Sequence, residues 1–360
     1  CTAIILSGLS YNHNNYLNYG LNLLNKIIKF SFNTEVFPKS RSIKQLIFYL
    51  KYFILIRELL KESQNEIPEH LNEVIYYLGQ AYNFLWQTTK KNFLFNGNNE
   101  NDYTNFDKYL NTHHYKFKNI NNEIGGYAIL KNKNIIIAMD MGSAPERKFS
   151  NNYQSGSLSF EMICSGEKII TNSGYFQDFK HQLNNISKST AAHSTLALDN
   201  SSICNFKKNN KGKLVIEKGF KILNKNVLLE KNSWNLMASH NGYQKKYGIV
   251  HERELNFFPE TNKLIGKDKI LKKKNFKSTN FEIRFHLIPD AKVTKTQDEK
   301  AILIELENSG WRFICEDHLI DVETGLYFGK KNSFMENQNI FISGKTYNQE
   351  QIIKWEIIKI

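Results

Sequence analysis

The chain has 360 residues, of which 41% are hydrophobic and 13% aromatic, and its formal net charge is +13. This length and this hydrophobic content exclude an intrinsically disordered protein and favour two packed domains. The positive charge favours an acidic partner, either an acidic polysaccharide or a nucleic acid, although a lysine-rich composition with a solvated surface gives the same excess. Because no helix-turn-helix, zinc-finger or RNA-binding signature accompanies the lysines, no nucleic acid is expected as a partner.

Residues 1–91 have the hydrophobic spacing of helices. Leucine and isoleucine recur at intervals of three and four residues in 14–30, and 40–63 repeats the pattern. Ser40 is a candidate N-cap for the second of these helices. Charged residues interrupt this helix, so it is not expected to span a membrane. Antiparallel helices joined by short loops predict a bundle or part of an α/α toroid.

After residue 91 the pattern changes. Residues 92–125 are polar and irregular and are interpreted as a linker, and from 126 to 360 apolar and polar residues alternate with the period of strands. Four hairpins are expected, with tips at Asn132-Lys133, Ser165-Gly166, Pro259-Glu260 and Asn308-Ser309-Gly310. Closely spaced strands predict an antiparallel β-sandwich or stacked β-sheets, so the fold class is α+β with two domains. The densest lysine run, LKKKNFK at 271–277, is expected to be a loop.

The chemistry-bearing residues carry few recognisable motifs. The four cysteines are far apart in the sequence, which excludes a zinc ribbon or a CxxC redox motif. Arg253 lies in a predicted strand and Arg41 at a predicted helix start. Each is either an ion-paired structural residue or a clamp for a carboxylate, because a guanidinium matches a carboxylate with two hydrogen bonds. The chain begins with Cys1 and is interpreted as a fragment that lacks its natural N-terminus.

Several stretches of the second half occur in the order found in one protein family. The chain resembles the C-terminal region of heparinase II/III-like proteins over roughly residues 30–350, and the most specific stretch is TAAHSTLALDN, which contains His193. The resemblance implies an α/α toroid followed by antiparallel sheets, and polysaccharide lyase activity. The stretches that carry it are YQSGSLSFEMICSGEKIITNSG, STAAHSTLALDN, LMASHNGYQKKYGIVHEREL, FEIRFHLIPD and GWRFICED.

The resemblance also implies a metal site, which this sequence alters. Members of the family carry an HxHxD motif, a D-S-G turn and an A-H-N-T segment. Zinc is bound by the second His of HxHxD, the Asp of the D-S-G turn and the His of A-H-N-T. These three positions are Gln154, Asn172 and His193 here, and the first His and the Asp of HxHxD fall on Asn152 and Gly156. Neutral amides are poor zinc ligands beside imidazole, so we expect that zinc is lost and that no cofactor is bound. The three side chains are expected to hydrogen-bond one another instead.

The chemistry that the resemblance implies is β-elimination at a uronic acid of an acidic glycan, such as a glycosaminoglycan or alginate. A base removes the C5 proton, an acid protonates the leaving oxygen, and cationic groups stabilise the carboxylate. Tyr175 or Tyr153 is expected to face the substrate cleft, and the alternative for each is a tyrosine that only packs in the core. Arg41 and Arg253 are the candidate cationic residues.

The resemblance further implies a periplasmic or cell-envelope location. It also implies a catalytic Tyr and an Asn-His pair in the toroid, which either precede this chain or occupy positions that do not align with it. The stretch YNHNNY at 11–16 contains these residue types and is interpreted as a helix–helix loop, with a catalytic segment as the alternative. The alternative function is a non-catalytic, degenerate glycan-binding relative that has lost the metal site.

Overall fold

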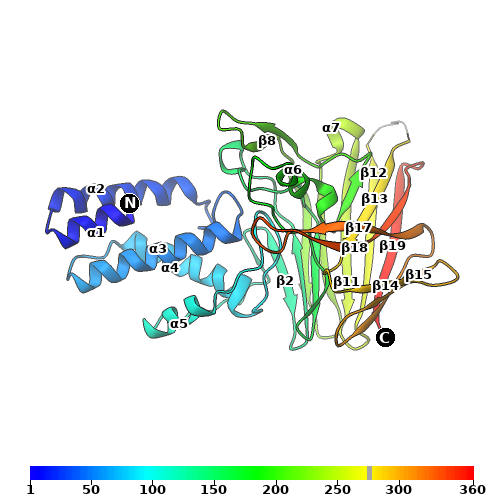
Figure 1. Ribbon diagram of the computed structural model, residues 1–360, viewed down its shortest axis with the longest axis horizontal. Helices are drawn as coiled ribbons and strands as arrows, with labels where there is room; N and C mark the ends of the chain where they lie inside the picture. The colour runs from blue at the N-terminus through cyan, green and yellow to red at the C-terminus, as the bar shows by residue number, and fades with distance from the viewer. Residues whose placement is uncertain (274–277) are drawn as a thin grey trace. The chain divides into compact units, whose positions relative to one another are not determined.

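The computed structural model describes residues 1–273 and 278–360, which form two compact units. Unit 1 contains residues 1–90 and 101–125, and unit 2 contains residues 91–100 and 126–360. The segment 92–125, which the sequence presents as a linker, is therefore divided between the two units. The predicted order of fold classes, helices first and antiparallel sheets afterwards, is confirmed (Figure 1).

Unit 1 is helical. Helix α1 packs against α2 and α3, and α3 packs against α4. The N-cap of α3 is Ser42, whose side chain accepts a hydrogen bond from the backbone N–H of Gln45 at 3.3 Å, whereas the hydroxyl of Ser40 bonds the Gln45 side chain. Among the described residues, no helix is long and apolar enough to cross a membrane. The elements of this unit are α1 (Thr2–Ser10), α2 (Asn14–Ser31), α3 (Ile43–Glu62), α4 (Glu69–Tyr82), the π-helix η1 (Asn83–Gln87), α5 (Thr104–Thr112) and β1 (Glu123–Ile124).

Unit 2 is built from antiparallel strands. The largest sheet has eight strands in the order β14-β15-β16-β19-β12-β11-β10-β9, a second has the order β17-β18-β13-β6, a third contains β2-β3-β4-β5, and β7 pairs with β8. The strands are β2 (Tyr127–Lys131), β3 (Ile135–Asp140), β4 (Phe160–Cys164), β5 (Glu167–Ile170), β6 (Leu196–Leu198), β7 (Asn205–Lys208), β8 (Leu214–Lys218), β9 (Ile222–Leu229), β10 (Trp234–His240), β11 (Ile249–Phe258), β12 (Lys263–Lys272), β13 (Asn280–His286), β14 (Lys292–Lys295), β15 (Ala301–Glu305), β16 (Gly310–Ile314), β17 (Leu319–Tyr327), β18 (Met335–Lys345) and β19 (Glu350–Lys359). The short helices are η2 (Arg147–Phe149), α6 (Gln182–Lys188), η3 (Thr190–Ala192) and α7 (Gln244–Tyr247).

The four predicted hairpins are present, as β2–β3, β4–β5, β11–β12 and β15–β16. Each predicted tip lies between or at the end of the paired strands, because the alternating pattern fixes which residues face the core and the polar pairs permit a tight turn. Of the lysine run expected as a loop, 271–272 end β12, and 274–277 lie outside the described residues.

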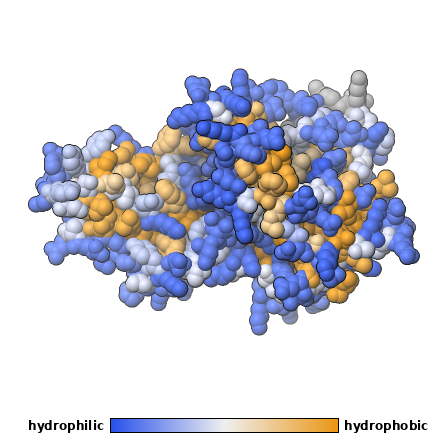
Figure 2. All heavy atoms as spheres, in the orientation of Figure 1, coloured by the Kyte–Doolittle hydropathy of each residue, from blue (hydrophilic) through white to orange (hydrophobic). Residues whose placement is uncertain are grey.

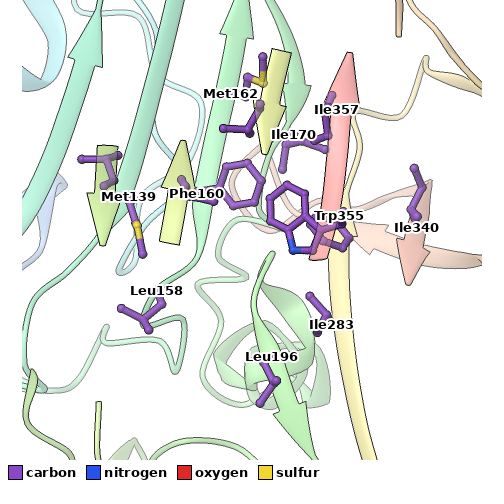
Figure 3. Packing of buried hydrophobic residues seen from close by; sticks show 14 of the residues in the cluster. Met139, Leu158, Phe160, Met162, Ile170, Leu196, Ile283, Ile340, Trp355 and Ile357 are labelled. Atoms are coloured by element: carbon purple, nitrogen blue, oxygen red, sulfur yellow. The ribbon is translucent and has the colours of Figure 1, made fainter. Parts of the chain in front are cut away.

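Aromatic side chains fill the centre of unit 2. The Trp355 ring stacks on Phe160, with centroids 5.6 Å apart (Figure 3). It also meets Phe285 edge-on at 4.7 Å. Trp355 also covers Gly266 on the neighbouring strand, where a Cβ atom would lie 2.0 Å from its ring, so only glycine fits there. This packing joins the large sheet to β4 and fixes the loops on either side of β4.

Candidate functional site

The loops before β4 and around α6 bring the three positions of the altered triad into the same buried region. Gln154 lies in the loop between η2 and β4, Asn172 follows β5, and His193 follows η3, and all three side chains are buried. Small and hydroxylated residues dominate these loops, and their hydroxyls satisfy much of the loop backbone. Thr195, for example, donates to the carbonyl of Ser157 at 2.9 Å. The loops are therefore internal structure as much as connections.

Gln154 uses both ends of its amide on backbone groups. Its Oε1 accepts from the N–H of Gly97 at 2.8 Å, and its Nε2 donates to the carbonyls of Gly174 and Ser187 at 2.8 and 2.6 Å. The side chain thus joins three separate loops of unit 2. An amide nitrogen that donates to two carbonyls cannot ligate a metal, and the amide oxygen already accepts the Gly97 N–H.

Asn172 is held in the same way, next to a buried charge. Its Oδ1 accepts from the Ser194 N–H at 2.9 Å, and its Nδ2 donates to Oε1 of Glu161 at 3.1 Å. Oε2 of Glu161 lies 3.0 Å from Nζ of Lys168, an ion pair that is off the hydrogen-bonding direction. Oε1 of Glu161 also accepts the Leu94 N–H at 2.7 Å, so Oε1 has two hydrogen-bond donors, whereas among the described residues Oε2 has only the ion pair with Lys168.

His193 is fully buried and bonds through one nitrogen. Nδ1 lies 2.9 Å from the carbonyl of Ser189, which requires the proton on Nδ1, and Nε2 has no partner. Burial lowers the pKa of His193 to about 4, so the ring is neutral at neutral pH. The ring lies against Gly156, where a Cβ atom would be 2.3 Å from Cδ2 of His193.

These three side chains do not fit a zinc ion. Apart from Nε2 of His193, which has no partner within the described chain, their polar atoms bond backbone groups and Glu161 rather than one another, so the expected hydrogen bonds within the triad are not found. In the part of the chain that the structure describes, no group of three His, Cys, Asp or Glu side chains is placed to hold a metal. The absence of zinc from the protein stays a prediction, and its measurement is elemental analysis of the purified chain.

Sequence reasoning missed the buried ion pair between Glu161 on β4 and Lys168 on β5. A signal was present, because Glu161 stands in the apolar run LSFEMI, where a charged residue on a buried strand needs a partner. His286, nearby, bonds the Ser173 hydroxyl at 3.2 Å and the Ala191 carbonyl at 2.9 Å. Burial lowers the pKa of His286 to about 3.

Tyr175 lies just after the Asn-Ser-Gly turn, within a set of amides. Its hydroxyl accepts from Nδ2 of Asn184 at 3.2 Å and lies 3.5 Å from Oδ1 of Asn152. Asn152 is exposed and occupies the first His position of the family motif, so Tyr175 has one neighbour that meets solvent. Burial raises the pKa of Tyr175, which keeps the hydroxyl protonated at neutral pH.

Lys188 ties this tyrosine to the loop that carries Asn152. Its ammonium lies 5.9 Å from the centroid of the Tyr175 ring and donates to the carbonyls of Asn151, Tyr153 and Leu214 at 2.6, 3.3 and 3.1 Å. Burial lowers its pKa to about 7. The other candidate tyrosine, Tyr153, is 1% exposed and packs in the core.

A cavity of about 400 Å³ lies beside this loop. Asn151 lines it, so the backbone that Lys188 holds is also the cavity wall. Arg147 and Lys148 supply positive charge, and Lys148 pairs with Glu146 at 3.2 Å. A cavity of this size with amide and cationic groups fits an acidic sugar.

Arg253 lies at the centre of unit 2 and is fully buried. Its Nε and Nη2 donate to the two carboxylate oxygens of Asp268 at 2.8 and 3.0 Å, and its Nη1 donates to the carbonyls of Leu158 and Ser194. Four of its five N–H groups are therefore used inside the protein, and the carboxylate that it clamps is its own Asp268. Trp355 donates to the same carboxylate at 2.9 Å.

Two histidines extend this ion pair into a chain of hydrogen bonds. The Gly242 N–H donates to Nδ1 of His240 at 3.1 Å, so His240 carries its proton on Nε2, which lies 3.3 Å from Nδ1 of His251. Nε2 of His251 then donates to Asp268 at 2.7 Å. Burial lowers the pKa of both rings, which keeps them neutral.

Arg41 belongs to unit 1, apart from the residues above. Its backbone has a φ of 57°, and its Nε donates to the carbonyl of Gly125 at 3.2 Å. The side chain is buried, and its hydrogen bond joins the loop before α3 to Gly125, the last residue of unit 1. Of the six predicted site residues, Gln154, Asn172, His193 and Tyr175 thus share one set of loops, and Arg253 reaches it through Ser194.

The sequence profile of the heparinase II/III-like, C-terminal family matches residues 122–356. No curated protein matches the chain. Among solved structures, the fold is similar to heparan sulfate lyase HepC from Pedobacter heparinus, with a TM-score of 0.77 and 14% identity over 99% of this chain and 59% of that one. A crystal structure of heparinase III has a TM-score of 0.79 and 14% identity over 100% of this chain and 60% of that one. The chain therefore spans less than two thirds of the length of these proteins.

Proposed function

Because the chain belongs to the heparinase II/III-like family over residues 122–356, we propose that it forms part of a polysaccharide lyase that cleaves acidic, uronic-acid-containing glycans by β-elimination. The observation that carries the proposal is the set formed by Tyr175, Asn152 and Lys188 beside a cationic cavity. The similar structures named as heparan sulfate lyase and heparinase III favour a glycosaminoglycan over alginate. A periplasmic or cell-envelope location is part of the proposal by resemblance.

Tyr175 is proposed as the general acid. Its pKa is raised by burial, so it holds a proton at neutral pH and is suited to give it to the leaving glycosidic oxygen. Asn184 and Asn152 orient the hydroxyl, and the exposed Asn152 is proposed to contact the substrate. No residue of unit 2 is proposed as the base that removes the C5 proton.

Arg41 and Arg253, the cationic residues that the sequence suggested, are not proposed to bind the carboxylate of the glycan. Arg253 is occupied by Asp268, so we propose that it positions the Ser194 loop and does not contact the glycan. Arg147 and Lys148 line the cavity and are proposed to pair with the glycan carboxylate or sulfate. Arg41 is proposed to hold the loop before α3 through Gly125.

The test is a lyase assay with a panel of glycosaminoglycans and polyuronates, followed by the ultraviolet absorbance of the unsaturated uronyl product. We expect product with at least one acidic glycan. Tyr175→Phe is expected to lower the rate by about 100-fold or more, since general acid catalysis contributes on that order. Tyr347→Phe, at an exposed tyrosine, is the matched control and is expected to keep the wild-type rate.

The second candidate is a non-catalytic glycan-binding protein. The observation that favours it is the loss of the metal donors at Gln154 and Asn172, whose amides bond other groups. Measurable binding of an acidic glycan, with no product from any member of the panel, would establish this function in place of the lyase.

A further inference from the structure

Unit 2 contains a second cavity, which lies beside β8 and α7 and has a volume of about 680 Å³. Pockets for small ligands measure roughly 300–1,000 Å³, so an oligosaccharide fragment fits. Three lysines line it, Lys218, Lys245 and Lys246, and no Asp or Glu does so among the described residues. Its hydrogen-bonding groups include Ser201, Asn205 and Gln244.

The three lysines are exposed, and none makes an ion pair within the described parts of the chain. The ammonium of Lys246 lies 4.7 Å from the centroid of the Tyr247 ring. An anion placed here meets three positive charges without displacing a carboxylate. Serine hydroxyls and amides bind the hydroxyls of an acidic sugar, and lysines bind its anionic substituents. An aromatic ring packs against the face of the sugar ring.

The wall of the cavity is held rigidly. The Gly242 N–H donates to the buried His240 at 3.1 Å, and a Cβ atom at Gly242 would lie 2.2 Å from Cγ2 of Ile203. The hydroxyls of Tyr247 and Ser201 lie 3.0 Å apart. A preformed wall lowers the entropic cost of ordering a binding site.

The β7–β8 hairpin connects this cavity with the one beside Arg147. Asn205 pairs with Lys218 at one end of the hairpin, and Asn209 and Val215 line the other cavity at the other end. The strands rise about 13–17 Å over their four and five residues, a distance that several sugars span. Hydrophilic residues gather over β8 in Figure 2, and the lysines of the hairpin outside the cavity are Lys207, Lys208, Lys211 and Lys213.

We propose that the cavity beside β8 and α7 is a binding subsite for an acidic oligosaccharide, which holds the glycan chain at a distance from Tyr175. The choice of a glycan as the ligand rests on the proposed function. Sulfate and carboxylate share the chemistry that lysines recognise, so the test separates these two sources of charge.

The experiment measures calorimetric binding of two probes, a heparin tetrasaccharide and a carboxylate-only tetramer of polygalacturonate. The variant is Lys218→Ala/Lys245→Ala/Lys246→Ala. The matched control removes three exposed lysines that line neither cavity, as Lys133→Ala/Lys231→Ala/Lys354→Ala. We expect the cavity variant to weaken binding by about tenfold or more and the control by about twofold or less. The probe that binds more tightly identifies the anion.

Hydrogen exchange on the wild-type protein with the bound probe locates the ligand. Protection of amides in 201–205 and 241–247 is expected. Equal weakening by the two triple variants, protection confined to 146–151 and 209–215, or no binding of either probe overturns the subsite. Lyase activity is measured separately, so a protein that shows this protection without product formation loses the proposed function and keeps the subsite.

Discussion

The imidazole of His193 lies against the bare backbone of Gly156, so close that a Cβ atom at that position would be 2.3 Å from its Cδ2. The family motif has its Asp at position 156 and a metal-binding His at position 193. In this chain the two positions have become complementary in shape, because the ring occupies the space that a side chain at 156 needs. The buried position of His193 therefore requires a glycine at position 156.

Gly156→Ala is expected to destabilise the protein by about 1–3 kcal/mol, because the His193 ring has to move within a packed region. The measurement is urea unfolding at neutral pH. Adding His193→Ala to this variant opens space for the new methyl group, so the two changes together are expected to cost less than the sum of the single changes. Strict additivity would contradict the packing argument.

Asn172→Asp restores the family's metal-binding residue and is expected to destabilise the chain. The new carboxylate would lie about 3 Å from Oε1 of Glu161 in a fully buried position, and an uncompensated buried charge costs about 3–5 kcal/mol. Burial and Glu161 both raise the pKa of the new carboxyl, so the loss of stability shrinks as the pH falls and the group takes up a proton.

The control for Asn172→Asp is the double variant Asn172→Asp/Glu161→Gln. It leaves one carboxylate instead of two in this buried region and is expected to recover part of the lost stability at pH 7. A single variant as stable as the wild type at pH 7 would show that the region tolerates two negative charges, for example by binding a cation.

Much of the fold follows from local sequence patterns. The β4–β5 and β11–β12 hairpins are predictable because alternation fixes the buried face and polar pairs mark the turn. The N-cap of α3 was assigned two residues early, because Ser40 and Ser42 are equally good caps and only the path of the chain selects Ser42.

The site was harder to predict, because its contacts join residues far apart in the sequence. The positions of Gln154, Asn172 and His193 follow from the family motif, but not their partners. Arg253 illustrates the limit, since its neighbours in the sequence do not reveal that Asp268, on the paired strand, takes its guanidinium. Lys188 gave no signal at all, because a lysine at the end of a short polar helix is ordinarily exposed.

Stability is expected to fall on mild acidification, starting near pH 6.5. Burial lowers the pKa of His193 to about 4 and of His286 to about 3, whereas unfolded histidine titrates near about 6.5. Below that pH the unfolded state binds protons that the folded state does not. Each histidine therefore removes about 1.4 kcal/mol of unfolding free energy per pH unit, until the pH reaches its folded pKa. Urea unfolding at pH 7.5, 6 and 5 measures the slope.

His286→Asn is the control for this pH dependence. It removes one buried histidine, and its slope between pH 6 and 5 is expected to be smaller by about one proton than that of the wild type. An unchanged slope would mean that His286 is already protonated or exposed in the folded chain.

Asp268→Asn is expected to cost about 3–5 kcal/mol, because it leaves the Arg253 guanidinium fully buried without a counter-charge. In the wild type, burial raises the pKa of Asp268, but the Arg253 charge and the His251 hydrogen bond outweigh it and hold the pKa well below its usual value. The ion pair therefore contributes fully above the unfolded pKa of about 3.9 and is lost only in stronger acid. The difference in unfolding free energy between variant and wild type should stay constant from pH 8 to 5.

Glu305→Gln, which breaks the exposed pair with Lys292, is the control and should cause no measurable loss. A loss at Asp268 as small as this control would mean that the guanidinium finds water once its partner is gone, and Arg253 would again be available to a ligand.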